Sequence, residues 1–242
     1  MMREFFTREE DGNLVHIEVD MNAFAYVKRF SWLFSVFVKF DALDESSAGF
    51  EEFLESKESL IIALENRDEA KYVGMRVVDG WSELYFYSNE SKELETTVAK
   101  MLAPSNYKYE SSVVKDTKWD FHYKNIYPTE LELCHIESEK IIFLLEEEGD
   151  DLTLPREVEH YVSFETPTQK NKFINSLSLE GFTLKDEIDA EEFENGVALV
   201  KTHAVSSEIV KEVVEELFVA IKKNQGFYEG WSTTLTNAKS QE

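Results

Sequence analysis

Two Asx-Gly dipeptides, each set between runs of strand-forming residues, restrict the possible folds of this chain more than any other feature. These two are Asp79-Gly80 and Asn195-Gly196, which lie at equivalent places in the two halves of the chain. Both central residues of a type I′ turn have positive φ, which Asn, Asp and Gly adopt more readily than other residues. Each dipeptide therefore predicts a tight hairpin of two antiparallel strands.

A helix and a further strand are predicted on either side of each hairpin, from helical spacing of apolar residues and from strand-like alternation. In the first half, strand, helix, strand, strand, helix and strand are predicted at 32–41, 47–66, 71–78, 81–87, 90–103 and 107–114, after a short strand at 14–20. In the second half the same order is predicted at 158–164, 167–181, 182–193, 197–205, 206–226 and 227–235.

The repeated order is βαββαβ, which is typical of the ferredoxin-like fold. We therefore predict an α+β protein of two ferredoxin-like α/β sandwiches. Each would have a four-stranded antiparallel sheet covered by two helices on one face. The acidic run Glu146–Asp151 lies between the halves, and it predicts a boundary between a domain at 1–150 and a domain at 151–242.

The chain is strongly acidic, with 49 Asp and Glu against 25 Lys and Arg and a net charge of −24 over 242 residues. The predicted domains carry −16 and −8, so the charge is not confined to a tail. Binding of nucleic acid draws most of its affinity from contacts between basic side chains and phosphates. We therefore expect no direct binding of nucleic acid or of an anionic membrane, and the acidity favours a basic protein partner. The alternative is that it serves only solubility.

Cysteine content and apolar runs bear on location. Cys134 is the single cysteine, which excludes an intramolecular disulfide framework. The first residues have no apolar segment typical of a signal peptide, and no stretch approaches the roughly 20 apolar residues of a membrane span. We expect a cytoplasmic protein. Open sheet edges also leave a homodimer as an alternative.

Sequence motifs of catalysis and cofactor binding are not found: there is no Gly-rich phosphate loop, Cys-x-x-Cys, His-Glu-x-x-His or Gly-x-Ser-x-Gly. We therefore predict a protein that is not an enzyme and has no cofactor or bound metal. The alternative is a metal-dependent hydrolase that uses Asp116, Asp120 and His122. On a strand, Asp120 and His122 would lie on the same face, which makes a shared metal geometrically possible.

Two features of the second half are candidates for a binding surface. The first is the acidic cluster of the predicted hairpin, which consists of Asp186, Glu187, Asp189, Glu191, Glu192 and Glu194. Its acidic residues do not have the spacing of a calcium-binding loop. It is either a docking surface for a basic protein or a solvated edge.

The second feature is the string Tyr228-Glu229-Gly230-Trp231 at the start of the last predicted strand. A glycine within a strand marks a bulge or a close approach. The flanking aromatic residues are either anchors of an interface or a cover for the end of the sheet.

These motifs carry a resemblance to two families. Residues from about 156 to 237 resemble the regulator of ribonuclease E activity B family, through Glu157-Val158-Glu159-His160, the acidic hairpin and residues 228–233. The closing motif of that family is Tyr-Asp-Gly-Trp-Gly-Thr, from which Glu229 and Ser232 depart.

Residues 14 to about 148 resemble the uncharacterised family called domain of unknown function 695. The matching residues are Asp79-Gly80-Trp81, Tyr107-x-Tyr109, Asp116-x-x-Trp119-x-Phe121-x-Tyr123 and Tyr127-Pro128.

The resemblance implies a small ferredoxin-like protein that binds an endoribonuclease and lowers its activity without chemistry of its own. We therefore expect a regulatory binding module for a basic protein partner, such as an endoribonuclease. Its predicted surface has two parts. Tyr228 and Trp231 would be buried in the interface, with the carboxylate of Glu229 beside them. The six acidic residues of the hairpin would steer the partner by their charge.

Overall fold

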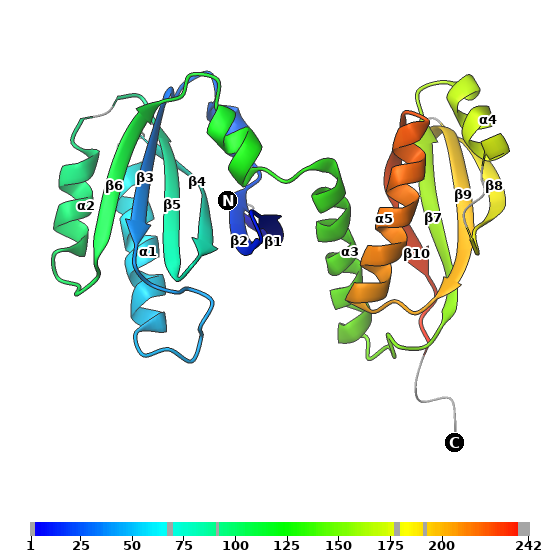
Figure 1. Cartoon of the computed structure of the whole chain (residues 1–242), viewed down its shortest axis with the longest axis horizontal. Helices are drawn as coiled ribbons and strands as arrows, with labels where there is room; N and C mark the ends of the chain where they lie inside the picture. Colours follow the sequence, from blue (N-terminus) through cyan, green and yellow to red (C-terminus); the bar gives the residue numbers. More distant parts are fainter. Residues whose placement is uncertain (1–2, 67–69, 91, 177–179, 191–192, 237–242) are drawn as a thin grey trace. The chain divides into compact units, whose positions relative to one another are not determined.

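The computed structural model describes residues 3–66, 70–90, 92–176, 180–190 and 193–236 and has an α+β architecture (Figure 1). The chain divides into two compact units, Met1–Pro128 and Thr129–Glu242. Each unit contains an antiparallel sheet with helices inserted between strands, as the sequence predicts.

The described part of the first unit contains a six-stranded sheet in the order β1-β2-β4-β5-β3-β6. Its strands are β1 (Arg3–Glu10), β2 (Asn13–Asp20), β3 (Trp32–Val38), β4 (Ala70–Val78), β5 (Trp81–Ser88) and β6 (Tyr109–Lys115). With α1 (Phe50–Glu65) and α2 (Leu94–Leu102), strands β3 to β6 form the predicted βαββαβ order. The predicted four-stranded sheet was wrong for this unit, because β1 and β2 extend it beside β4.

The β1–β2 hairpin turns at Asp11-Gly12, where φ is 51° and 80°. This is the same type of turn as Asp79-Gly80, which has φ values of 52° and 70° and joins β4 to β5 as predicted. Strand β1 was not predicted because most of its residues are charged. Its two apolar residues, Phe5 and Phe6, are adjacent, so they do not alternate with polar residues as in a typical strand.

Both faces of the first sheet are covered, whereas the sequence predicted helices on one face. On one face, α1 and α2 pack on a core that includes Phe34 and Phe86. On the other, Tyr85 packs against Trp119 and Ile126, which come from the segment around the short π-helix η2 (His122–Ile126). The 3-10 helix η1 (Ala23–Tyr26) contributes to the same core.

Within the described residues, the second unit has a four-stranded sheet in the order β10-β7-β9-β8. Its elements are α3 (Glu130–Glu147), β7 (Arg156–Phe164), α4 (Pro167–Ser176), β8 (Thr183–Ala190), β9 (Phe193–His203), α5 (Ser207–Lys223) and β10 (Gly226–Thr233). From β7 to β10 they form the predicted βαββαβ arrangement.

The predicted turn at Asn195-Gly196 was wrong, because both residues lie inside β9. Gly196 is opposite Ile188 on β8, and the register between these strands shifts beside that pair. Asn195 has φ of 53°. Asparagine adopts positive φ more readily than most residues, and here this conformation occurs at an irregularity within the strand instead of in a turn. A β-carbon on Gly196 would lie 2.1 Å from the ring of Phe193, which explains the glycine.

Helix α3 belongs to the second unit, although the sequence placed the boundary after it, at residue 150. The helix begins with a capping box, in which the Thr129 hydroxyl accepts from the Glu132 N–H and the Glu132 carboxylate accepts from the Thr129 N–H. Its residues Ile142 and Leu145 share a core with Val158 and Val214.

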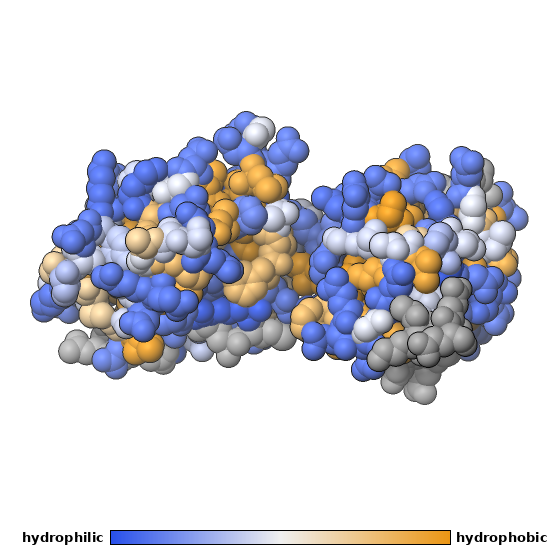
Figure 2. All heavy atoms as spheres, turned by 90° about the horizontal axis from the view of Figure 1, so that it is seen from below, coloured by the Kyte–Doolittle hydropathy of each residue, from blue (hydrophilic) through white to orange (hydrophobic). Residues whose placement is uncertain are grey.

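Moving the boundary to residue 128 changes the distribution of charge. The second unit contains 25 acidic and 10 basic residues, a net charge of −15, and the first carries the remaining −9. The surface seen in Figure 2 is mostly hydrophilic, with apolar patches on each unit. Among the described residues, no helix is both long and apolar enough to span a membrane.

Candidate functional site

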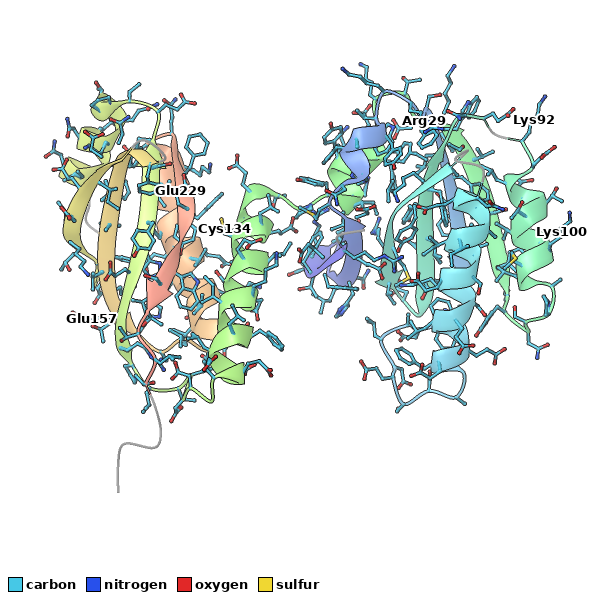
Figure 3. The ribbon with its side chains drawn as sticks, turned by 180° about the vertical axis from the view of Figure 1, so that it is seen from behind. Arg29, Lys92, Lys100, Cys134, Glu157 and Glu229 are labelled. Carbon is cyan, nitrogen blue, oxygen red and sulfur yellow. The ribbon has the colours of Figure 1, made fainter. Side chains whose placement is uncertain are left out.

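A groove in the second unit lies between α3 and β10 and has a volume of about 230 Å³. One face of α3 lines it with residues at helical spacing, from Glu130 to Ile141, and the end of α5 contributes Phe218 and Lys222. Strand β10 supplies residues 228–231, the string that the sequence predicted as a binding surface. Figure 3 shows Cys134 on α3 at the side that faces β10.

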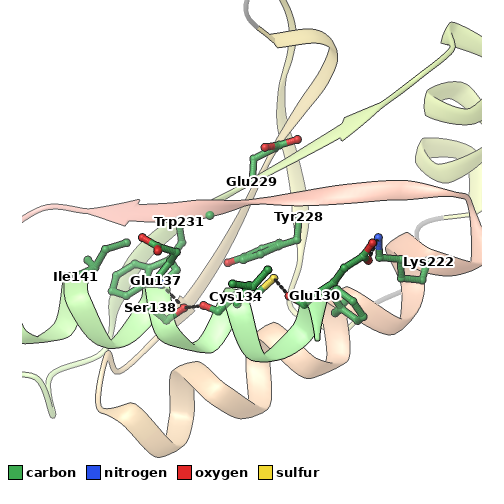
Figure 4. A pocket seen from close by; sticks show the side chains of 12 residues that line it. Glu130, Cys134, Glu137, Ser138, Ile141, Lys222, Tyr228, Glu229 and Trp231 are labelled. Atoms are coloured by element: carbon green, nitrogen blue, oxygen red, sulfur yellow. Dashed lines mark hydrogen bonds and ion pairs between the residues drawn. The ribbon is translucent and has the colours of Figure 1, made fainter. Parts of the chain in front are cut away.

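A β-bulge places Tyr228 and Trp231 on the same side of β10. In a regular strand, residues three positions apart point to opposite faces. Here the register with β7 shifts between Tyr228 and Gly230, so that Glu229 is an extra residue. Gly230 has φ of 126°, a conformation that favours glycine. Figure 4 shows both aromatic side chains directed toward α3 and Glu229 directed away from it. Of the two roles that the sequence left open for this glycine, a bulge or a close approach, the structure shows the bulge, and no atom lies within 4 Å of an added β-carbon.

Trp231 forms the floor of the groove and is only 5% exposed. Its indole Nε1–H donates to Oγ of Ser138 at 3.1 Å, and that hydroxyl donates to the carbonyl of Cys134 at 2.8 Å. The tryptophan therefore covers the end of the sheet, and its position also defines the depth of the groove.

Tyr228 forms a wall of the groove and is fixed by a chain of hydrogen bonds into the core. Its hydroxyl lies 2.9 Å from Nδ1 of His160, whose Nε2 lies 3.1 Å from Nε2 of His203. The other His203 nitrogen lies 2.7 Å from the carbonyl of Ala204, which can only accept. His203 Nδ1 is therefore the donor, His160 donates to His203, and Tyr228 donates to His160.

The pKa values agree with this assignment. Burial lowers the pKa of His160 to about 3, and burial also lowers the pKa of His203. Burial raises the pKa of Tyr228. At neutral pH both rings are uncharged and the tyrosine is protonated, which is the state that the chain of hydrogen bonds requires.

The rim of the groove is acidic. Among the described residues that line it, Glu130, Glu137 and Glu229 are acidic and Lys222 is basic. Lys222 is ion-paired with Glu130, and Glu229 accepts a hydrogen bond from the Ser163 hydroxyl. The rim thus presents a net negative charge around an apolar floor.

Cys134 is a half-buried thiol on the α3 side of the groove and donates to the carbonyl of Glu130 at 3.1 Å. Burial raises the pKa of this thiol to about 11. The thiol is therefore protonated at neutral pH, whereas the thiolate is the reactive form of cysteine. The groove suits binding better than nucleophilic chemistry.

The acidic cluster of the predicted hairpin lies at the opposite edge of the sheet from the groove, because β8 and β10 are the outer strands. Asp186, Glu187 and Asp189 are exposed on β8, and Glu187 pairs with Lys170 at 3.0 Å. Glu191 and Glu192 lie outside the described residues, as does the side chain of Glu194. The structure therefore does not bring the two predicted surfaces together.

The residues of the alternative hydrolase site are not arranged to share a metal. The Asp116 carboxylate accepts from the Tyr87 hydroxyl at 2.6 Å and from the N–H groups of Phe121 and Asp120. Asp120 and His122 lie in a helical segment, not on a strand. In the part of the chain that the structure describes, no group of three His, Cys, Asp or Glu residues could hold a metal ion.

His122 is instead a buried ring among aromatic side chains. Phe24 and Trp119 contact it edge-on, with ring centroids 5.0 and 5.4 Å away. Burial lowers its pKa to about 4. It therefore belongs to the apolar core of the first unit.

Comparison with known families divides the chain in the same way. Residues 4–127, just over half of the chain, match the sequence profile described as "Family of unknown function (DUF695)". The chain belongs to this family. A second match covers residues 135–233, with the profile described as "Regulator of ribonuclease activity B". No curated protein matches the chain.

The second match begins within α3 and ends at the last residue of β10, so it contains most of the groove. The β10 side of the groove was predicted from the sequence, whereas the residues from α3 and the buried pair His160 and His203 were not. The helical spacing from Glu130 to Ile141 was a usable signal, which the misplaced boundary assigned to the other domain.

Proposed function

We propose that this protein is a non-catalytic regulator of a ribonuclease, which it binds through its second unit. The observation that carries the proposal is the match of residues 135–233 to the family of ribonuclease regulators, since these residues include most of the groove. An apolar groove with an acidic rim is suited to holding a protein partner.

The charge of the second unit supports a basic partner. At −15 against −9, this unit attracts a basic surface more strongly than the first unit, and such attraction raises association rates. The acidic residues of β8 are exposed and lie at the edge of the sheet away from the groove. We assign them a role in steering the partner and assign contact to the groove.

A binding titration with charge-reversal variants tests this proposal. The full chain is titrated onto an immobilised, catalytically inactive endoribonuclease with a basic segment. A variant with Asp186→Lys, Glu187→Lys and Asp189→Lys should associate at least about tenfold more slowly at low salt. The matched control carries Glu51→Lys, Glu52→Lys and Glu55→Lys on α1 of the first unit, where all three residues are exposed.

The control makes the same change in net charge, so it isolates the position of the charges. Equal association rates for the two triple variants would contradict the steering role. Failure of the unmodified chain to bind endoribonucleases would contradict the proposed function itself.

A further inference from the structure

The groove runs along a free edge of the second sheet. Strand β10 is the outermost strand and pairs with β7 on one side. On its other side, no strand pairs with it among the residues that the structure describes. An edge strand presents backbone N–H and C=O groups that can pair with an added strand.

The size of the groove favours a side chain over a small-molecule ligand. Its volume is about 230 Å³, below the roughly 300–1,000 Å³ of typical small-molecule pockets. Apolar groups of Leu133, Ile141, Phe218, Tyr228 and Trp231 surround it. One large apolar side chain of a partner matches both the volume and the lining.

The groove is also held in shape before any partner arrives. Trp231 is fixed by Ser138, and Tyr228 is fixed by the chain through His160 to His203. A preformed site binds with a smaller loss of conformational entropy than one that must be ordered by its ligand.

The rim determines which residues should flank the apolar side chain. The side chains of Glu130 and Glu137 are each 65% exposed, and Glu229 is exposed on the far side of β10. Lys222, the basic residue of the described lining, is paired with Glu130, and Glu137 is paired with Lys140 of the same helix at 2.8 Å. Glu229 therefore supplies the negative charge of the rim that these two lysines do not neutralise. Charge complementarity therefore favours Lys or Arg in the segment that binds here.

We propose that an extended segment of the protein partner adds as a strand to the free edge of β10 and inserts one large apolar side chain into the groove, with Lys or Arg beside it. Main-chain hydrogen bonds would supply affinity, and the groove and rim would supply specificity. This inference rests on the proposed function, because it describes how the partner of that function is held.

Synthetic peptides test the inference with the full chain. The probe is an 11-residue peptide with Phe at its centre and alternating Arg and Val on either side. Two matched peptides replace the central Phe by Ser or carry N-methyl groups on alternate backbone nitrogens. Calorimetry should show binding of the first peptide and at least about tenfold weaker binding of each of the others. Backbone amides of β10 should exchange more slowly with the first peptide bound.

A variant that fills the groove locates the binding site. Cys134→Trp places a large ring in the groove from α3 and should weaken binding of the first peptide by at least about thirtyfold. The matched control is Leu144→Trp, on the same helix, where the side chain is exposed and does not line the groove. If Cys134→Trp does not fold, the pair Glu137→Lys and Glu229→Lys should weaken binding of the basic peptide by at least tenfold.

The inference is overturned if the first peptide does not bind at about 1 mM, or if N-methylation leaves its affinity unchanged. It is also overturned if Cys134→Trp folds and still binds the peptide normally. Normal regulation of the ribonuclease by folded Cys134→Trp would reject the groove as the docking site and leave the proposed function standing. Peptide binding without any effect on ribonucleases would support the groove and reject the proposed function.

Discussion

At the scale of single residues, the site depends on the backbone conformation of Gly230. The φ of 126° at this residue accompanies the bulge that places Tyr228 and Trp231 on the same side of β10. Each aromatic side chain is then fixed by a separate partner, His160 for the tyrosine and Ser138 for the tryptophan. A change at Gly230 therefore affects the floor of the groove and one of its walls at once.

Replacement of Gly230 by Ala should lower the free energy of unfolding by about 1–3 kcal/mol, because a β-carbon is strained at this φ. No atom lies within 4 Å of the added β-carbon, so the cost comes from the backbone and not from a clash. Urea unfolding measures the change. Ser232→Ala, at an exposed position of the same strand, is the control; it removes one exposed hydrogen bond, to the Tyr161 hydroxyl, and should cost less than about 1 kcal/mol. Equal costs for the two variants would contradict the strain at Gly230.

His160 gives a prediction for pH. Its pKa of about 3 lies below the 6.5 of an ordinary histidine, so protonation favours the unfolded chain. Its contribution to stability is complete above about pH 6.5 and declines as the pH falls toward 3, by about 1.4 kcal/mol for each pH unit. Urea unfolding at pH 7 and 5.5 should show the decline, which His160→Gln should reduce. An NMR titration in which the His160 ring protonates near pH 6.5 would show the assignment to be mistaken.

At the scale of elements, helix α3 decides where the second unit begins. Its capping box at Thr129 and its core residues Ile142 and Leu145 attach it to the unit that contains Trp231. The acidic run at 146–151 suggested a linker, but the break between the compact units comes before the helix, at Pro128.

Removal of α3 should therefore destabilise the second unit. A fragment of residues 151–242 lacks Ser138, Ile142 and Leu145 and exposes Trp231, whereas a fragment of residues 129–242 keeps them. We expect the shorter fragment to unfold at lower urea concentration, by several kcal/mol, since each large buried residue lost costs about 2–5 kcal/mol. Tryptophan fluorescence should also shift to longer wavelength. Equal stability of the two fragments would place α3 outside the folded unit.

Strand alternation and helical spacing were sufficient to predict both βαββαβ arrangements, because each element buries a regular stripe of apolar residues. The turn residues located the first hairpin at Asp79-Gly80 but misplaced the turn of the second, since Asn195-Gly196 lies inside β9. The β1–β2 hairpin was missed because charged residues hide the alternation in β1, although Asp11-Gly12 marks its turn. The β10 side of the groove was predicted, because a glycine between two aromatic residues within a strand can be recognised in the local sequence. The partners Ser138, His160 and His203 could not be predicted, because their contacts join residues that are 43 to 93 positions apart in the chain.

At the scale of the whole molecule, the net charge of −24 is carried mainly by the second unit, at −15. Attraction of a basic partner by these charges is screened over about 10 Å at 0.1 M salt. The association rate with the ribonuclease should therefore fall steeply as salt is raised, and the dissociation rate should change much less. A stopped-flow series in increasing salt measures both, and an association rate independent of salt would contradict a steering role for the charge.

The central claim is that the second unit binds a ribonuclease and changes its activity. The most direct measurement is the rate of cleavage of a fluorescent RNA by a purified endoribonuclease, with increasing amounts of the full chain. We predict a saturable fall in the cleavage rate, which persists in Leu144→Trp and is lost in Cys134→Trp. A cleavage rate that stays constant over the whole titration with the unmodified chain, for endoribonucleases with and without a basic segment, would contradict the account.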